Sequence, residues 1–244
     1  MRDLFYLLLC LLMYSAASAQ YTDSTQHHAR FAATGSINRT AKGTAYLFNN
    51  GLRLGMRRKK ISLNANAGWV YGEQQNALTN NDFTAVSDAN LYSDTGRKFY
   101  FWGLGSYTSS YSLKINNQVQ AGAGIAYSFI DNGTWFLNLS EGLLYERSDI
   151  IKADSTQEIY STVRNSLRLV FRINYRERII FDGRGYWQPS LLESEDYIIK
   201  SNLGLQFKLN SWLSFTSTVI YNNFNLTRSE NLLFTYGLTA ERYF

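Results

Sequence analysis

Long runs in which apolar and polar residues alternate are the feature that most constrains this chain. Between Tyr197 and Asn210, mainly apolar side chains occupy one face of an extended strand, and lysine, asparagine, glycine and glutamine occupy the other. The alternation recurs from Phe31 onward, and no segment there keeps an apolar repeat at helical spacing. The sequence therefore predicts an all-β protein whose strands each have one apolar and one polar face.

Turn residues divide the chain into about twelve strands. We expect these near residues 31–40, 44–57, 61–72, 83–93, 97–109, 115–130, 134–146, 159–174, 178–188, 197–209, 212–224 and 231–244. Such strands are longer than the usual 5–6 or so residues of globular sheets, and the single proline, Pro189, agrees with long ladders because proline donates no backbone hydrogen bond. Long strands in even number are typical of the transmembrane antiparallel up-and-down β-barrels of Gram-negative outer membranes.

The expected connections alternate between short turns and longer polar loops. Short turns are expected at 58–60, 94–96, 131–133, 175–177 and 210–211, and longer loops at 73–82, 147–158, 189–196 and 225–230. In outer-membrane barrels the short turns are periplasmic, which predicts that both termini are periplasmic too. The final residue, Phe244, would then lie in the periplasmic aromatic girdle, where it resembles the C-terminal signal read by the barrel-assembly machinery.

The N-terminal segment has the composition of an export signal. Arg2 precedes an apolar stretch from Leu4 to Met13, and Ala17-Ser18-Ala19 supplies the small residues of a cleavage site. We expect residues 1–19 to be a cleaved signal peptide, 20–29 a periplasmic tail and 30–244 the barrel. The single cysteine, Cys10, lies within the expected signal, so no disulfide is predicted.

A water-soluble β-sandwich or lipocalin-like barrel would also show alternation. Such folds turn their apolar face inward and fill a core with it. Here the polar rows are rich in glycine, asparagine and arginine, which a dry interior does not tolerate. The pattern therefore favours an outer-membrane barrel with lipid outside and water inside.

Three stretches resemble a known family. They are "GAGIAYSF" at Gly122 to Phe129, "GLLYERSD" at Gly142 to Asp149, and the closing run "LGLQFKLNSWLSFTSTVIYNN…LTAERYF". They are similar to uncharacterised bacterial outer-membrane barrels that carry the label salt-induced outer membrane protein. The resemblance implies an outer-membrane barrel and a connection with salt or osmotic response, and it implies no catalytic motif.

The sequence argues against an enzyme. Enzymes in such barrels generally use a histidine as base, whereas both histidines, His27 and His28, are expected before the first strand. No zinc spacing or phosphate-binding glycine loop occurs, so neither a metal nor a cofactor is predicted. The basic run Arg57 to Lys60 is expected to be a solvated turn rather than a nucleic-acid site.

Charged residues on the expected inner row form the main candidate site. The cations are Arg53, Arg57, Arg164, Arg168, Arg172, Arg184, Lys200 and Lys208. The anions are Asp88, Glu146, Asp182 and Glu241. Arg164, Arg168 and Arg172 recur every four residues and would form a ladder that draws anions along the lumen.

Two interpretations of this row stay open. The arginines either line an anion path, or pair with carboxylates such as Glu146, Asp182 and Glu241 and fill the lumen. Glu141 falls on the lipid-facing row, where we expect a bulge near Gly142 to turn it inward or a partner to meet it.

The sequence thus predicts a monomeric barrel in contact with outer-membrane lipid, with small anionic solutes as partners and no nucleic acid. A closed structural barrel is the alternative, followed by an enzyme with a lumenal active site.

Overall fold

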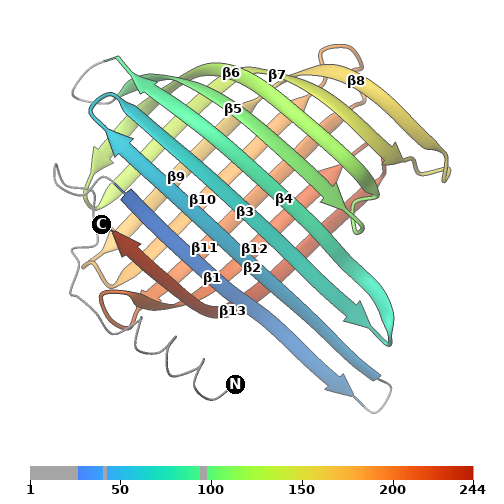
Figure 1. Ribbon diagram of the computed structural model, residues 1–244, viewed down its shortest axis with the longest axis horizontal. Coiled ribbons are helices and arrows are strands. Elements are labelled where there is room, and N and C mark those ends of the chain that lie inside the picture. The colour runs from blue at the N-terminus through green and yellow to red at the C-terminus, as the bar shows by residue number, and fades with distance from the viewer. Residues whose placement is uncertain (1–26, 41–42, 94–97, 244) are drawn as a thin grey trace.

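The alternating segments form one antiparallel sheet that closes on itself (Figure 1). The computed structural model describes residues 27–40, 43–93 and 98–243. The expected signal peptide, most of the expected tail and Phe244 lie outside these residues. No helix among the described residues is long and apolar enough to cross a membrane.

The wall of the barrel contains twelve strands, as predicted. The labelled elements are β1 (His27–Thr40), β2 (Gly43–Arg58), β3 (Ile61–Gln74), β4 (Ala77–Tyr92), β5 (Phe99–Ser110), β6 (Ile115–Asn132), β7 (Trp135–Ile151), β8 (Gln157–Asn165), β9 (Leu167–Tyr175), β10 (Ile179–Pro189), β11 (Tyr197–Lys208), β12 (Leu213–Phe224) and β13 (Ser229–Tyr243).

Elements β8 and β9 are two parts of one strand. Both keep the same register with β7, because Arg164 pairs with Leu144 and Arg168 pairs with Ser140. Only Ser166 separates them, and its backbone N–H donates to Gly142 O at 2.8 Å. Neighbouring strands follow one another around the wall, and the β1–β13 and β6–β7 ladders complete the ring.

The predicted faces are confirmed by exposure. On β13, Leu232 and Phe234 are 69% and 58% exposed, whereas Thr235 and Thr239 are fully buried. Large apolar side chains therefore face outward, where an outer-membrane barrel contacts lipid, and polar side chains face the lumen. This inside-out arrangement is what a chain needs when its outer solvent is hydrocarbon.

Three expected boundaries are wrong by four residues or more, and one of them is the end of β7, which lies at Ile151 and not at residue 146. The segment 73–82 is not a long loop, because β3 and β4 continue to Gln74 and Ala77 and are joined by Gln75 and Asn76, with φ of 53° and 64°. Both values suit a tight hairpin turn. The polar residues of this segment suggested a loop, but a hairpin that projects beyond the apolar belt has polar strands.

The first strand also begins earlier than expected, at His27. The polar pair His27-His28 suggested a tail, yet the alternation of His28, Arg30, Ala32 and Thr34 with apolar neighbours continues the strand. The start of β1 and the last residues of β13 lie together, at what we call the termini end of the barrel. The opposite end, with the connections 75–76, 111–114, 152–156, 190–196 and 225–228, is called the loop end.

The β1–β13 seam depends on a glycine. A Cβ at Gly237 would lie 2.3 Å from Ala33 O and 2.7 Å from Thr34 Cα. Both contacts are with backbone atoms of β1, so side-chain movement would not relieve them. Gly237 therefore allows the two strands to approach closely enough to close the barrel.

We predict that Gly237→Ala lowers the free energy of unfolding by about 1–3 kcal/mol because the added methyl pushes β1 away. Urea unfolding in lipid vesicles measures this. The control is Gly51→Ala, since a Cβ at Gly51 meets nothing within 4 Å. Equal stability of the two variants would contradict this account of the seam.

Candidate functional site

The barrel interior holds three neighbouring cavities with basic walls. Two measure about 420 Å³ and one about 330 Å³, and all three are lined by Arg53. We call them together the basic chamber. Its cationic lining residues are Arg30, Arg53, Arg168, Arg172, Arg184 and Lys200. Its acidic lining residues are Asp82, Asp88, Asp182 and Glu241. Six cations therefore face four anions among the described residues.

None of these six cations has a carboxylate oxygen within 4 Å in the described part of the chain. Their observed partners are neutral. Arg53 Nε donates to Asn66 Oδ1 at 2.8 Å, and Arg168 Nε donates to Ser140 Oγ at 2.9 Å. Arg172 lies over the Phe136 ring at 5.8 Å. These contacts orient the guanidinium groups without neutralising them.

Strand register brings some acids near the arginines. Arg172 and Asp182 are Cα partners across β9 and β10, and Arg30 stands between Glu241 on β13 and Arg53 on β2. The charges are thus interleaved around the wall. Because no carboxylate oxygen lies within 4 Å of a chamber cation in the described residues, an incoming anion would not have to displace a formed ion pair.

Arg164 belongs to a different arrangement. It is fully buried, and its Nε and Nη2 donate to the two oxygens of Glu146, each at 2.8 Å. Its Nη1 and Nη2 also donate to Asp196 Oδ1 at 3.0 Å and Oδ2 at 2.8 Å. The guanidinium is therefore held by two carboxylates at once.

Neutral groups complete this Arg164 cluster. Gln120 and Tyr160 donate to Glu146 at 2.6 and 2.8 Å, and Gln188 O accepts from Arg164 Nη1 at 3.3 Å. Burial raises the pKa of the Asp196 carboxyl, and the hydrogen bonds from Arg164 oppose that rise. The cluster ties the 190–196 loop to the inner wall of β7 and β8.

The predicted arginine ladder is therefore divided. Arg164, Arg168 and Arg172 share the inner face, as expected, but Arg164 is enclosed by Glu146 and Asp196. Only Arg168 and Arg172 line the chamber. The pairing interpretation thus applies to Arg164 with Glu146, whereas the anion path stays a hypothesis for Arg168 and Arg172.

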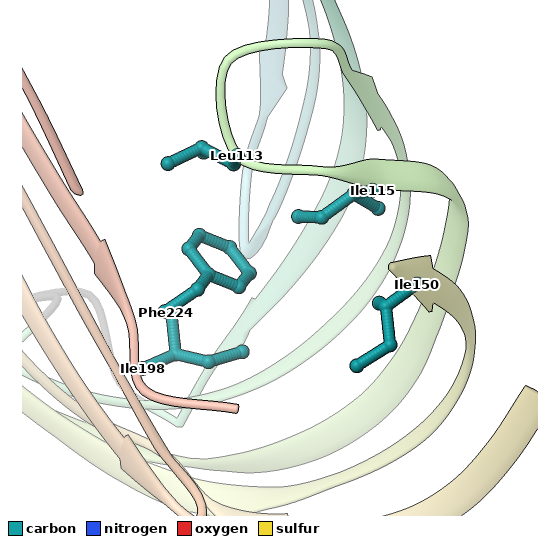
Figure 2. Packing of buried hydrophobic residues seen from close by; sticks show 5 residues of the cluster. All are labelled: Leu113, Ile115, Ile150, Ile198 and Phe224. Atoms are coloured by element: carbon teal, nitrogen blue, oxygen red, sulfur yellow. The ribbon is translucent and has the colours of Figure 1, made fainter. Parts of the chain in front are cut away.

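Apolar side chains pack together inside the barrel near the loop end. Leu113, Ile115, Ile150, Ile198 and Phe224 converge inside the barrel, as Figure 2 shows. They come from the β5–β6 turn and from β6, β7, β11 and β12. All five are at most 5% exposed. This mouth cluster covers the chamber from the loop end.

The β5–β6 turn, residues 111–114, is held over the lumen by polar contacts. Asp82 on β4 accepts from Ser110 Oγ at 2.8 Å, Ser112 N at 3.0 Å and Ser112 Oγ at 2.7 Å. Asn231 on β13 donates to the same Ser112 Oγ at 2.8 Å. The turn is thus fastened to strands on two sides of the barrel, and we call these contacts the clasp.

Three further predicted charges are Arg57, Lys208 and Asp88, the last of which also lines the chamber. Arg57 packs over the Tyr92 ring at 5.7 Å, and Asp88 accepts from Asn64 and Asn90 at 2.9 and 3.0 Å. Lys208 lies at the end of β11, outside the lining of the three cavities.

The histidines are not in a tail, contrary to the sequence-based expectation. Both belong to β1, and His28 Nε2 lies 2.8 Å from Glu241 Oε1. The argument against an enzyme assumed that both histidines precede the first strand, and this assumption is wrong. No group of three or more potential metal-ligating His, Cys, Asp or Glu side chains occurs within the described residues.

Glu141 stays on the lipid-facing row. The irregularities of the β6–β7 ladder occur at Ile115/Asn117 and Ser128/Ile130, not at Gly142. Glu141 instead has a polar partner, which was the other alternative, because Asn165 Nδ2 donates to Glu141 Oε1 at 3.0 Å.

Several interior residues escaped the sequence analysis. Arg30 was overlooked at the expected boundary of the barrel, although it shares the parity of Ala32 and Thr34. Asp82 and Asp196 were assigned to loops, where their inward contacts leave no periodic signal.

We predict that Arg164→Met lowers the free energy of unfolding by about 3–5 kcal/mol, because two buried carboxylates lose their cation. Urea unfolding in vesicles, followed by tryptophan fluorescence, measures the loss. The matched control is Arg168→Met, which removes a chamber cation that has no carboxylate within 4 Å among the described residues. Equal losses in the two variants would show that the Arg164 cluster contributes no more to the free energy of unfolding than Arg168 does.

The solved structures that resemble this chain are outer-membrane barrels. NanC porin aligns with a TM-score of 0.53 at 7% identity over 88% of this chain and 99% of that one. An outer-membrane channel of Pseudomonas putida F1 gives 0.52 at 10% identity over 95% and 100%. The translocator domain of the autotransporter NalP from Neisseria meningitidis gives 0.51 at 11% identity over 98% and 93%. At these identities the likeness establishes the fold.

A search of curated proteins gives no match. A family model does match, over residues 22–239, and this range covers nearly all of the barrel. The chain therefore belongs to the family described as "Protein of unknown function, DUF481".

Proposed function

We propose that the protein is an outer-membrane channel whose basic chamber passes small anionic solutes. The observation that carries this proposal is the set of six chamber cations without a carboxylate inside 4 Å among the described residues. In this proposal the termini end faces the periplasm, and the protein is a monomer assembled by the barrel-assembly machinery.

Electrostatics favours anions in such a chamber. Closely spaced cations in a narrow space with low-dielectric walls raise the local concentration of counter-ions. Rings of arginine and lysine are a common source of anion selectivity in pores. Because Asn66, Ser140 and Phe136 hold the arginine head groups in place, a solute meets charges that are already oriented.

In this proposal passage requires movement at the loop end, because the mouth cluster and the clasp lie across the lumen there. The turn 111–114 is short and has one residue at positive φ, Lys114, at 58°. Its hold on the far wall consists of the bond from Asn231 to Ser112 and the packing of Leu113. Loss of those contacts would free the turn while the β5–β6 ladder remains.

Two of the similar structures are named as a porin and a channel, which supports transport over catalysis. The resemblance to salt-induced proteins adds the expectation that synthesis of the protein responds to external salt.

A closed structural barrel is the second candidate. The Arg164 cluster and the mouth cluster favour it, since together they seal one end with buried ion pairs and apolar contacts.

We predict that the purified, refolded protein gives anion-selective single-channel currents in planar bilayers under a salt gradient. Combining Arg30→Gln, Arg53→Gln, Arg172→Gln and Arg184→Gln should lower the anion-to-cation permeability ratio several-fold, because the chamber loses four cations. The charge-matched control carries Arg58→Gln, Lys59→Gln, Arg176→Gln and Arg178→Gln, all exposed near turns. An unchanged ratio in the chamber variant would refute the proposed anion path.

Opening the mouth separates the two candidates. Asp82→Asn with Ser112→Ala weakens the clasp, so the channel proposal expects more frequent opening in this variant. Silence from both this variant and the wild type, each shown to be folded and inserted, would favour the closed barrel.

A further inference from the structure

The hydrogen-bonded wall is interrupted between β1 and β13. Their ladder joins His28–Gly35 to Tyr236–Tyr243 and ends at the pair Gly35 and Tyr236. Continued in the same register, it would place Ser36 opposite Thr235 and Thr40 opposite Asn231. Instead, residues 36–40 pair only with β2, and residues 229–235 pair only with β12. Both strands continue, but they separate.

The separation starts at a well-defined level. Thr34 Oγ1 donates to Thr235 Oγ1 at 3.0 Å on the inner face of the wall, next to the last ladder pair, Gly35 and Tyr236. Beyond this pair, β1 and β2 extend past β13 but stay paired with each other, and β2 stays paired with β3 (Figure 1). Five residues of β1 are involved, which corresponds to roughly 17 Å of strand. We call this gap the β1–β13 split.

The outer rim of the split is apolar. Ile37 and Leu232 are each 69% exposed, and Phe234 is 58% exposed. Unpaired backbone groups are costly in hydrocarbon, so where lipid reaches this rim the open split needs polar atoms from another molecule. A lipid-like molecule with a polar head and an apolar chain satisfies both conditions.

On its inner side the split adjoins the chamber. Thr34, Asn231 and Leu233 line one of the cavities of about 420 Å³, together with Lys200 and Phe224. Lys200, Asn222 and Asn231 form one row across β11, β12 and β13, and Asn222 Nδ2 donates to Asn231 Oδ1 at 3.0 Å. The row places a cation and two amides at the level of the split.

Lys200 is suited to hold a single negative charge. Its ammonium lies 5.1 Å from the centre of the Phe224 ring, and no carboxylate oxygen lies within 4 Å in the described residues. Leu113, Ile220 and Leu233 line the same cavity and provide apolar surface beside this charge.

We propose that the β1–β13 split is a lateral portal through which single-chain amphipathic anions pass between the outer leaflet and the chamber. The head group, a carboxylate or a phosphate, binds Lys200 and the two asparagines, and the chain leaves between Ile37 and Phe234. This inference deepens the proposed function, since it names the substrate class and gives the chamber a side exit below the closed mouth.

The test uses spin-labelled dodecanoate, dodecyl phosphate and dodecylphosphocholine with the refolded full chain in phosphatidylcholine vesicles. Electron paramagnetic resonance reports the immobilised fraction of each probe. The two anionic probes distinguish a fatty acid from a lipid phosphate, and the zwitterionic probe reports ordinary contact with the barrel surface. We expect immobilisation of at least one anionic probe well above that of the zwitterionic probe.

Cross-linking shows whether the split is the route. In a Cys10→Ser background, Ser36→Cys with Thr235→Cys is joined by a short reducible cross-linker. The matched control joins Ala33→Cys to Leu238→Cys, which are already ladder partners. We expect the first cross-link to abolish immobilisation until it is reduced, and the second to leave it unchanged. We also expect Lys200→Gln to lower immobilisation several-fold, and Lys208→Gln to leave it unchanged.

The failures are distinguishable. If the wild type immobilises no anionic probe, or the first cross-link has no effect, the portal is refuted whatever the small-anion current shows. If the probe binds through the split but no current of small anions is found, the portal stands and the channel proposal falls.

Discussion

Closure of the backbone hydrogen-bond ladder is the constraint on which this structure depends. In hydrocarbon every strand needs a neighbour on both sides, so the wall must form a ring. The ring fixes the period of two, because each strand then has lipid on one face and the lumen on the other. Gly237 shows how strict the requirement is, since a single added carbon would meet the backbone of β1. The ring is incomplete at one place, because residues 36–40 of β1 and 229–235 of β13 do not pair with each other.

The ring also decides how charge is distributed inside. Because the apolar face of each strand points outward, most lumenal side chains are polar, and this chain uses the charged ones in two ways. Near the loop end, Arg164 is neutralised by Glu146 and Asp196 and serves the fold. Deeper in the barrel, Arg53, Arg168 and their neighbours are held by neutral groups and keep their charge.

Much of this was predictable from sequence, because the period of two is a local signal. The twelve strands and the inward positions of Arg53, Arg168 and Arg172 follow from it. The clasp and the Arg164–Asp196 contact do not, since they depend on how turns fold back over the lumen. His27 and His28 were misassigned because a polar pair at the edge of the apolar belt looks the same in a tail and in a strand.

The central claim is that the chamber cations are available to anions. A crystal structure of the protein soaked in bromide, with anomalous scattering measured at the bromine edge, tests it directly. The account predicts bromide peaks within hydrogen-bonding distance of Arg30, Arg53, Arg172 or Arg184. A chamber without bromide, in which those arginines contact Asp182 and Glu241 directly, would contradict it.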